Sequence, residues 1–267
     1  MQASRATRIA LRVATALTLA FIYLPLAVVV LYAFNAAPLT RWPIEGLTLD
    51  WFCQALGDEG VRSALTASLL AAIGATAVAL VLGSLLAFAV HRYSFFGRDA
   101  VSFAVILPIA LPGIVTGIAL NTAFRTIGFE FGLLTVIIGH ATFCIVVIYN
   151  NVIARLRRTA RSAEEASMDL GADTFQTFRR VTLPAIGTSL VAGALLAFAL
   201  SFDEIIVTTF TAGAGTQTLP IWIFANYARP NQLPLVNVAA LFVLVLSIVP
   251  VYLSARLTRD PAAIGRT

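Results

Sequence analysis

The sequence has 267 residues, of which 59% are hydrophobic and only 12% are charged, and its mean hydropathy is +0.90. Soluble domains carry about 25% charged residues, so this composition excludes a water-soluble globular protein and predicts an all-α polytopic membrane protein. The net charge of +5 therefore does not indicate nucleic-acid binding. Every basic residue is an arginine. Because a phosphate-binding P-loop needs a lysine, a nucleotide-hydrolysing site of that type is also excluded.

Six apolar runs could cross a membrane, since about twenty helical residues span the hydrocarbon core. They cover residues 13–34, 64–90, 101–124, 133–153, 185–210 and 235–257. A secretory signal is the alternative interpretation of the first run. That run is longer than the roughly 7–15 apolar residues of a signal, and we interpret it as an uncleaved span. We expect residues 1–267 to form a single transmembrane domain.

The arginines are distributed unevenly between the predicted loops. With the N-terminus inside the cell, the outer segments hold only Arg41, Arg62, Arg125 and Arg229, and the other fourteen arginines are cytoplasmic. Cytoplasmic loops of membrane proteins carry the excess of basic residues. The pattern predicts that both termini are cytoplasmic, and that residues 155–184 form a cytoplasmic loop between the fourth and fifth spans.

The third run contains two prolines, Pro108 and Pro112, in the sequence LPIALPGIVTG. Proline removes a backbone donor and kinks a helix, and membrane proteins tolerate such kinks where they pack against protein or line a cavity. The run is predicted to be one bent span. It either lines a transport pathway or is kinked only for packing.

The 155–184 loop is the one long charged interruption of the apolar sequence and is predicted to fold as two short helices. Ser162 followed by Glu165 has the pattern of a capping box that starts a helix. Gly171 is placed to end that helix in a left-handed conformation. Asp173 followed by Gln176 can start the second helix.

The second helix has an apolar edge, formed by Phe175, Phe178 and Val181, and Pro184 is predicted to mark the entry into the fifth span. An apolar edge outside the membrane needs a surface to cover it. A partner protein is one solution. An amphipathic hairpin that rests on lipid headgroups, with Arg179 and Arg180 on the phosphates, is the other.

This loop resembles the EAA loop of bacterial ABC importer permeases. The family pattern is Glu-Ala-Ala, three residues, Gly, nine residues, Ile, any residue, Leu-Pro; the matching positions here are Glu165, Ala166, Ser167, Gly171, Val181, Thr182, Leu183 and Pro184. Ser167 and Val181 depart from the pattern by small, conservative changes. The six-span layout, LPIALPGIVTG and SFDEIIVTTFTAG extend the resemblance over nearly the whole chain, which looks most like the second permease subunit of spermidine/putrescine-type importers.

The resemblance implies a type I permease fold in the bacterial inner membrane, with a coupling helix that docks onto a separate ATPase. Its implied docking residues are Glu165, Ala166, Ser167, Gly171, Leu183 and Pro184. The chain itself would be no enzyme and hold no cofactor, because the partner subunit uses the ATP. The implied partners are a dimer of ATPase subunits, a second permease subunit, an extracytoplasmic substrate-binding protein and membrane lipid.

An acidic pair, Asp203 and Glu204, interrupts the fifth apolar run just after Ser201. Carboxylates within a membrane are costly and indicate function, so Ser201, Asp203 and Glu204 are predicted to lie on a path for cationic substrate. Adjacent helical residues point about 100° apart, so only one carboxylate should face that path. In the alternative interpretation both carboxylates cap a broken helix or pair with Arg125 or Arg229. His140, in the fourth span, is predicted to form hydrogen bonds between helices.

These features bear on three possible functions, of which two are compatible with them. The first is a permease subunit of an ATP-driven importer of polyamines or related organic cations. The second is an ion-coupled secondary transporter of cationic amines that uses the same carboxylates. The third, a membrane enzyme, lacks a recognisable catalytic set of residues.

Overall fold

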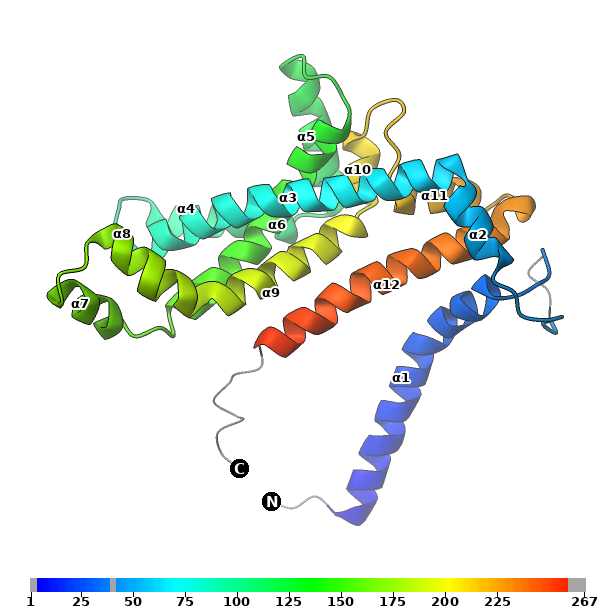
Figure 1. The fold of residues 1–267 in the computed structure, drawn as a ribbon, viewed down its shortest axis with the longest axis horizontal. Coiled ribbons are helices and arrows are strands. Elements are labelled where there is room, and N and C mark those ends of the chain that lie inside the picture. The colour runs from blue at the N-terminus through cyan, green and yellow to red at the C-terminus, as the bar shows by residue number, and fades with distance from the viewer. Residues whose placement is uncertain (1–3, 39–41, 259–267) are drawn as a thin grey trace. The chain divides into compact units, whose positions relative to one another are not determined.

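The computed structural model describes residues 4–38 and 42–258, and over these ranges the chain is helical (Figure 1). It contains no strand in the described ranges, where a single isolated β-bridge pairs Asn35 with Leu47. The predicted all-α class is confirmed. Parts of both termini, and Arg41, Arg259 and Arg266 of the predicted charge asymmetry, lie outside the described residues.

Five of the described helices are long and apolar enough to cross a membrane. They are α1 (Arg5–Ala33), α3 (Glu59–Arg92), α6 (Leu133–Leu156), the continuous helix Thr174–Phe202 and the helical segment Pro230–Leu257, most of which is α12 (Leu233–Thr258). The remaining predicted span, the third in chain order, is a pair of helices, α4 (Arg98–Ala110) and α5 (Gly113–Thr126). The helix direction bends by 107° between them. Counting that pair as one span gives the six that the sequence predicts.

The bend between α4 and α5 is a complete break, where the sequence predicts a kink within one helix. Leu111 is extended, with φ −80° and ψ 145°, as expected for a residue before proline. Pro112 then begins α5 as its N-cap. Helix α4 therefore ends at Ala110, because the ring of Pro112 disfavours the helical conformation at Leu111, the residue before it.

The chain divides into two compact units, Met1–Arg62 with Ile223–Phe242 and Ser63–Trp222 with Val243–Thr267. In the first unit, the short helix α2 (Asp50–Gly57), which the sequence does not predict, packs near the end of α1. The Trp51 indole donates to the Asn35 carbonyl at 2.9 Å. The Phe52 ring lies 4.9 Å from that of Phe34 and 6.3 Å from that of Phe242.

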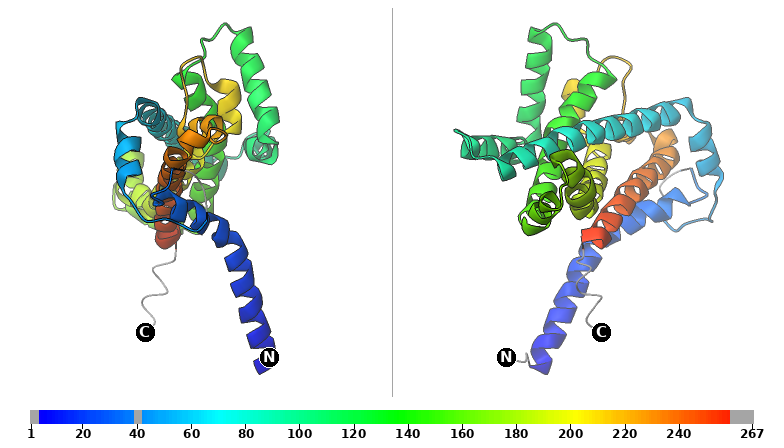
Figure 2. Two further views of the ribbon diagram at one scale, coloured as in Figure 1. Left: turned by 90° about the vertical axis from the view of Figure 1, so that its right-hand side faces the viewer. Right: turned by 60° about the vertical axis from the view of Figure 1, so that its left-hand side comes forward.

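The core of the second unit lies where α3, α6 and α9 (Leu183–Phe202) meet (Figure 2). Small residues allow this approach: a Cβ at Gly83 of α3 would lie 2.8 Å from the Ile145 carbonyl, and one at Gly193 of α9 would lie 3.2 Å from Ile148. Close packing through small residues is typical of membrane helices. The core thus holds three predicted spans together, and two of them, α6 and α9, flank the 155–184 loop.

Candidate functional site

The 155–184 loop folds as a hairpin of two helices, α7 (Ser162–Asp169) and α8 (Thr174–Thr177), at one end of the second unit (Figure 1). The two predicted helices are confirmed, but the predicted capping box is wrong. The N-cap of α7 is Arg161, whose carbonyl accepts from the amides of Glu164 and Glu165 at 3.0 and 3.1 Å. Ser162 therefore lies one position too late to cap the helix.

Gly171 ends α7 as predicted. Its φ is +88°, in the left-handed region. Its amide donates to the Met168 carbonyl at 2.9 Å, and the Ala172 amide donates to the Ser167 carbonyl at 3.1 Å. These two bonds form a Schellman motif. A Cβ at Gly171 would meet no other atom of this chain within 4 Å, so the space beside the turn is open.

The second helix begins as predicted, with a capping box between Asp173 and Gln176. It does not end before the fifth span, however. A π-helical segment, η1 (Phe178–Thr182), joins α8 to α9, and the Leu183 amide bonds to the Phe178 carbonyl. Pro184 offers no amide to the preceding turn, and a π-bulge accommodates the missing bond within a continuous helix. The prediction that Pro184 marks the entry into the fifth span agrees with the start of α9 at Leu183, although no break separates the loop from the span.

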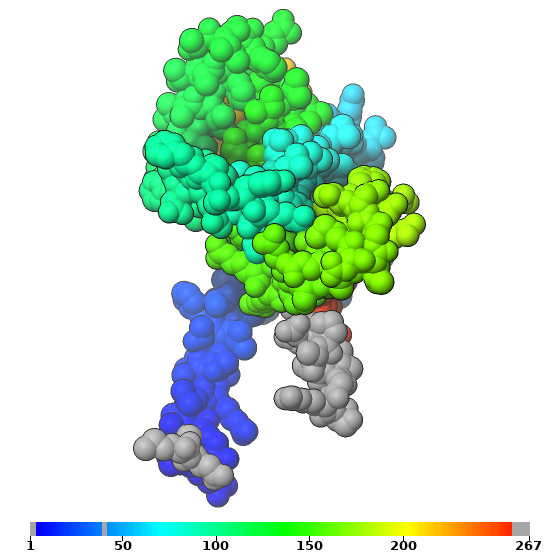
Figure 3. All heavy atoms as spheres, turned by 90° about the vertical axis from the view of Figure 1, so that its left-hand side faces the viewer, coloured from blue at the N-terminus to red at the C-terminus, as the bar shows by residue number. Residues whose placement is uncertain are grey.

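The predicted apolar edge of the hairpin is divided between its two sides. Phe178 faces inward, where its ring lies 5.6 Å from that of Phe88 on α3. Phe175 is 69% exposed, and beside it in the hairpin Leu170 and Met168 are 90% and 47% exposed. Figure 3 looks onto this end of the second unit, and the hairpin lies at the front of the view. The hairpin thus exposes three large apolar side chains on its surface.

The six residues of the predicted docking set do not share one environment. Glu165, Ala166 and Gly171 are exposed, whereas Ser167 is half-buried and its hydroxyl lies 3.2 Å from that of Thr177. Leu183 and Pro184 are exposed on the continuous helix. Among the described residues, Glu165 forms an ion pair only with Arg161, at 3.5 Å, and both side chains remain largely in solvent.

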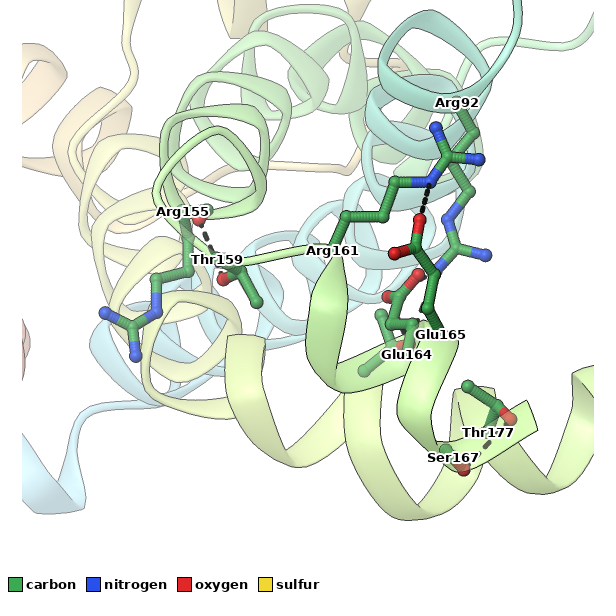
Figure 4. Close-up of polar contacts among 9 residues, drawn as sticks. Arg92, Arg155, Thr159, Arg161, Glu164, Glu165, Ser167 and Thr177 are labelled. Atoms are coloured by element: carbon green, nitrogen blue, oxygen red, sulfur yellow. Dashed lines mark hydrogen bonds and ion pairs between the residues drawn. The ribbon is translucent and has the colours of Figure 1, made fainter. Parts of the chain in front are cut away.

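A polar cluster that the sequence does not predict fixes the hairpin to the membrane helices. Arg92, at the end of α3, lies beside Glu164 (Figure 4), with 2.6 Å between Arg92 Nη2 and Glu164 Oε1. Thr182 Oγ1 donates to the same carboxylate oxygen at 2.6 Å. Arg92 Nη2 also donates to Thr182 Oγ1 at 3.3 Å. On the other side, Arg155 Nε donates to the Ala185 carbonyl at 2.9 Å.

The fifth predicted span, residues 185–210, is broken at the acidic pair. Helix α9 ends at Phe202 and α10 (Ile206–Thr211) begins after Ile205. Glu204 Oε1 accepts from the Val207 amide at 2.8 Å, so Glu204 caps α10. This is the alternative that the sequence left open for Glu204.

Asp203 lies in a different environment from its neighbour. It is exposed at the C-terminal end of α9, and within the described part of the chain no hydrogen bond or ion pair involves its carboxylate. The arginines proposed as alternative partners are engaged elsewhere: Arg125 Nε donates to Asn121 at 2.9 Å, and Arg229 donates to Asn226 at 3.1 Å. The predicted pairing with these arginines is not observed. Of the two carboxylates, only that of Asp203 is open.

His140 joins the two halves of the broken helix. Its Nδ1 lies 2.7 Å from Ser201 Oγ at the end of α9, and its Nε2 lies 2.8 Å from Thr208 Oγ1 in α10. The Thr208 hydroxyl donates to the Glu204 carbonyl, so the ring proton fits on Nε2 and Ser201 donates to Nδ1. The prediction that His140 bonds between helices is confirmed. Ser201, predicted to line the path, is buried beneath this contact.

The far end of α10 is held by side chains of its neighbours. Asn121 Nδ2 donates to the Phe210 carbonyl at 2.6 Å, and Thr135 Oγ1 donates to the Thr211 carbonyl at 2.7 Å. Both bonds satisfy carbonyls that a helix end leaves unpaired. With Glu204 at one end and Asn121 and Thr135 at the other, the short helix beyond the acidic pair is fixed against α5 and α6.

Comparison with known proteins agrees with this architecture. Residues 79–261 match the family described as binding-protein-dependent transport system inner membrane component. The chain is 34% identical over 248 residues to the putrescine transport system permease protein PotI of Escherichia coli K12, covering 88% of this chain and 87% of that protein. It is 31% identical over 242 residues to the spermidine/putrescine transport system permease protein PotC of the same strain, covering 90% of each.

Solved structures resemble the fold at lower identity. A bacterial ABC transporter involved in the import of the acidic polysaccharide alginate has a chain that superposes over all of this one with a TM-score of 0.68 and 17% identity. A chain of the methionine transporter MetNI, in an inward-facing conformation, matches 80% of this chain and all of its own length with a TM-score of 0.55 and 19% identity. These likenesses confirm the predicted type I permease fold.

These findings give no support to the secondary-transporter alternative, and the relatives are permeases rather than enzymes. The family match covers more than half of the chain, and the relatives span nearly all of it. The chain is a multi-pass protein and belongs to the family of inner membrane permease components of binding-protein-dependent ABC import systems.

Proposed function

We propose that this permease imports polyamines such as putrescine and spermidine, or closely related organic cations. Two relatives that are named for these substrates align over about nine-tenths of this chain. The open carboxylate of Asp203 at the break of the fifth span supports a cationic substrate, because an unpaired negative charge within a transport path attracts cations. The fold itself does not decide the substrate, since a similar fold belongs to a transporter of an acidic polysaccharide.

The proposed assembly contains two ATPase subunits, a second permease subunit and an extracytoplasmic binding protein. The exposed hairpin supports the ATPase contact: Met168, Leu170 and Phe175 place apolar side chains outside the membrane, beside the open space at Gly171. An apolar patch of this kind is typical of a protein interface. In this proposal the whole chain acts as one permease domain within lipid, both termini are cytoplasmic, and Glu165, Ala166 and Gly171 lie at the ATPase contact. Leu183 and Pro184 carry the hairpin into the membrane.

In the proposed transport cycle, closure of the ATPase dimer around ATP displaces the hairpin, and the membrane helices open outward to accept the cation. ATP hydrolysis reverses the displacement. The chain contributes no nucleotide site, which is consistent with the absence of lysine from its sequence.

Purification with candidate partners and vesicle uptake test the proposal together. A tagged copy of the chain, coexpressed with the ATPase, the second permease and the binding protein, should retain the ATPase through purification. Reconstituted vesicles should accumulate labelled putrescine or spermidine only with ATP in the compartment that holds the ATPase, and ionophores should leave uptake intact. Uptake that persists without ATP and stops with ionophores would favour the secondary transporter instead.

A further inference from the structure

The cluster of Glu164, Arg92 and Thr182 joins three elements that lie far apart in the sequence. Arg92 is in the last turn of α3, Glu164 is in the first turn of α7, and Thr182 closes the π-helical segment that leads into α9. Oε1 of Glu164 accepts hydrogen bonds from both Arg92 Nη2 and Thr182 Oγ1, each at 2.6 Å. A single carboxylate oxygen thus ties the hairpin to two membrane helices.

This cluster differs in kind from the neighbouring ion pair on the same helix. The side chains of Glu164 and Arg92 are 17% and 31% exposed, and Thr182 is buried. The pair of Glu165 with Arg161 is longer, at 3.5 Å, and its side chains are 59% and 84% exposed. Exposed ion pairs contribute little to the stability of the fold because water and salt screen the attraction between their charges. Partly buried pairs that share further hydrogen bonds hold their geometry more strongly.

Packing around the cluster extends the connection. The Arg92 guanidinium lies over the Phe88 ring, 5.6 Å from its centroid, and Phe88 contacts Phe178 of the π-helical segment. Arg92 is therefore held by an aromatic ring on one side and by Glu164 and Thr182 on the other. A displacement of α7 cannot leave the end of α3 or the start of α9 in place without breaking this set of contacts.

We propose that Glu164, Arg92 and Thr182 are positioning residues that make the hairpin move as one body with α3 and α9, so that its displacement reaches the membrane helices. This inference rests on the proposed function for the source of the displacement. The contacts themselves belong to this chain alone and can be tested without any partner.

The first experiment measures how firmly the hairpin is held in the purified chain, by limited digestion with trypsin in lipid nanodiscs. Glu164→Gln removes the charge with little change in shape, and Thr182→Val removes the hydroxyl while keeping a β-branched side chain. Each should raise the rate of cleavage after Arg179 and Arg180 about fivefold, because local opening controls access to helical sites. The matched control is Glu165→Gln, which removes the exposed ion pair and should leave that rate unchanged.

The second experiment uses the assembled transporter and measures uptake per ATP hydrolysed. Glu164→Gln should lower this ratio about tenfold while the ATPase still copurifies, because the hairpin would dock but no longer move α3 and α9. Exchanging the charges, with Arg92→Glu and Glu164→Arg together, should restore the ratio. The Thr182 hydroxyl can donate to one partner and accept from the other in either arrangement.

Two results would overturn the proposal. Equal cleavage rates for Glu164→Gln and Glu165→Gln would show that the cluster does not hold the hairpin. An unchanged uptake ratio in Glu164→Gln would show that the cluster does not transmit its movement. If the unmodified assembly shows no ATP-dependent uptake, the proposed function fails, and the cleavage rates still decide whether the cluster holds the hairpin.

Discussion

Gly171 and Gly128 provide a matched pair of residues for testing the hairpin surface. Both have positive φ, +88° and +71°, and at neither would a Cβ meet another atom within 4 Å. Both end a helix in the same motif: the Gly128 amide bonds to the Arg125 carbonyl at 3.1 Å and the Phe129 amide to the Phe124 carbonyl at 2.8 Å. A side chain at either position should therefore cost the same backbone strain, about 1–2 kcal/mol.

Gly171→Leu should abolish retention of the ATPase during purification, and uptake with it, whereas Gly128→Leu should retain the ATPase. The reason is that only the space beside Gly171 is proposed to be filled by a partner. Both variants should insert into the membrane and show similar losses in thermal stability. Retention of the ATPase by Gly171→Leu would remove this turn from the interface.

The two carboxylates at the break should respond differently to neutralisation. Asp203 ends α9, where the backbone carbonyls carry partial negative charge and disfavour an anion. Asp203→Asn should leave the thermal midpoint unchanged or slightly raised, while uptake of divalent or polyvalent amines falls at least about tenfold through loss of attraction for the cation.

Glu204→Ala supplies the contrast, because Glu204 caps α10 through the Val207 amide. It should lower the free energy of unfolding by about 1 kcal/mol through loss of the cap. Uptake kinetics and thermal melts of both variants measure the difference. Unaltered polyamine uptake by Asp203→Asn, at any substrate concentration, would remove Asp203 from the path.

At the scale of elements, the break in the fifth span depends on α6. His140 bonds to Ser201 on one side of the break and Thr208 on the other, and its ring is fully buried. His140→Phe keeps an aromatic ring but leaves the Ser201 hydroxyl without this partner. We expect a loss of about 1–3 kcal/mol in the free energy of unfolding, measured by thermal or denaturant unfolding in detergent.

Thr142→Val is the control for His140→Phe, since the hydrogen bond that the Thr142 hydroxyl makes in the described structure stays within its own helix, to the Gly139 carbonyl. Thr142→Val should lower the free energy of unfolding by no more than about 0.5 kcal/mol, because a local side-chain bond of that kind contributes little to the stability of a helix. Similar losses in the two variants would mean that the interhelical bridge does not stabilise the break.

The sequence predicts elements well where one local signal decides them. Gly171 and Asp173 are examples, because a left-handed turn and a capping box each need only a few neighbouring residues. It does not distinguish between the two structures that a proline can produce. Pro112 ends a helix, whereas Pro184 is accommodated by a π-helical segment within a continuous one. The difference depends on packing, such as that of Phe178 on Phe88, which spacing along the chain does not reveal.

For the whole molecule, the apolar composition predicts the membrane class, and the apolar runs predict all six spans when α4 and α5 count as one, since about twenty apolar residues suffice for each. The cluster that holds the hairpin could not be predicted in the same way. Arg92 lies 72 residues from Glu164, and Glu164 lies 18 residues from Thr182. No periodicity relates such positions. The family pattern includes the adjacent Glu165 and not Glu164, so it does not indicate a role for Glu164.

Orientation in the membrane can be tested with the two cysteines of the chain. Cys53 is exposed in the segment between α1 and α3, which the arginine distribution places outside, and Cys144 is buried in α6. A membrane-impermeant maleimide added to intact spheroplasts should label the protein once, and Cys53→Ser should abolish the label.

The hairpin side is tested in the Cys53→Ser background. There, Leu170→Cys should react with the maleimide only after the membrane is opened, because Leu170 is exposed on the hairpin and the hairpin is predicted to be cytoplasmic. Labelling of Leu170→Cys in intact spheroplasts would reverse the orientation, and an ATPase in the cytoplasm could then no longer reach the hairpin.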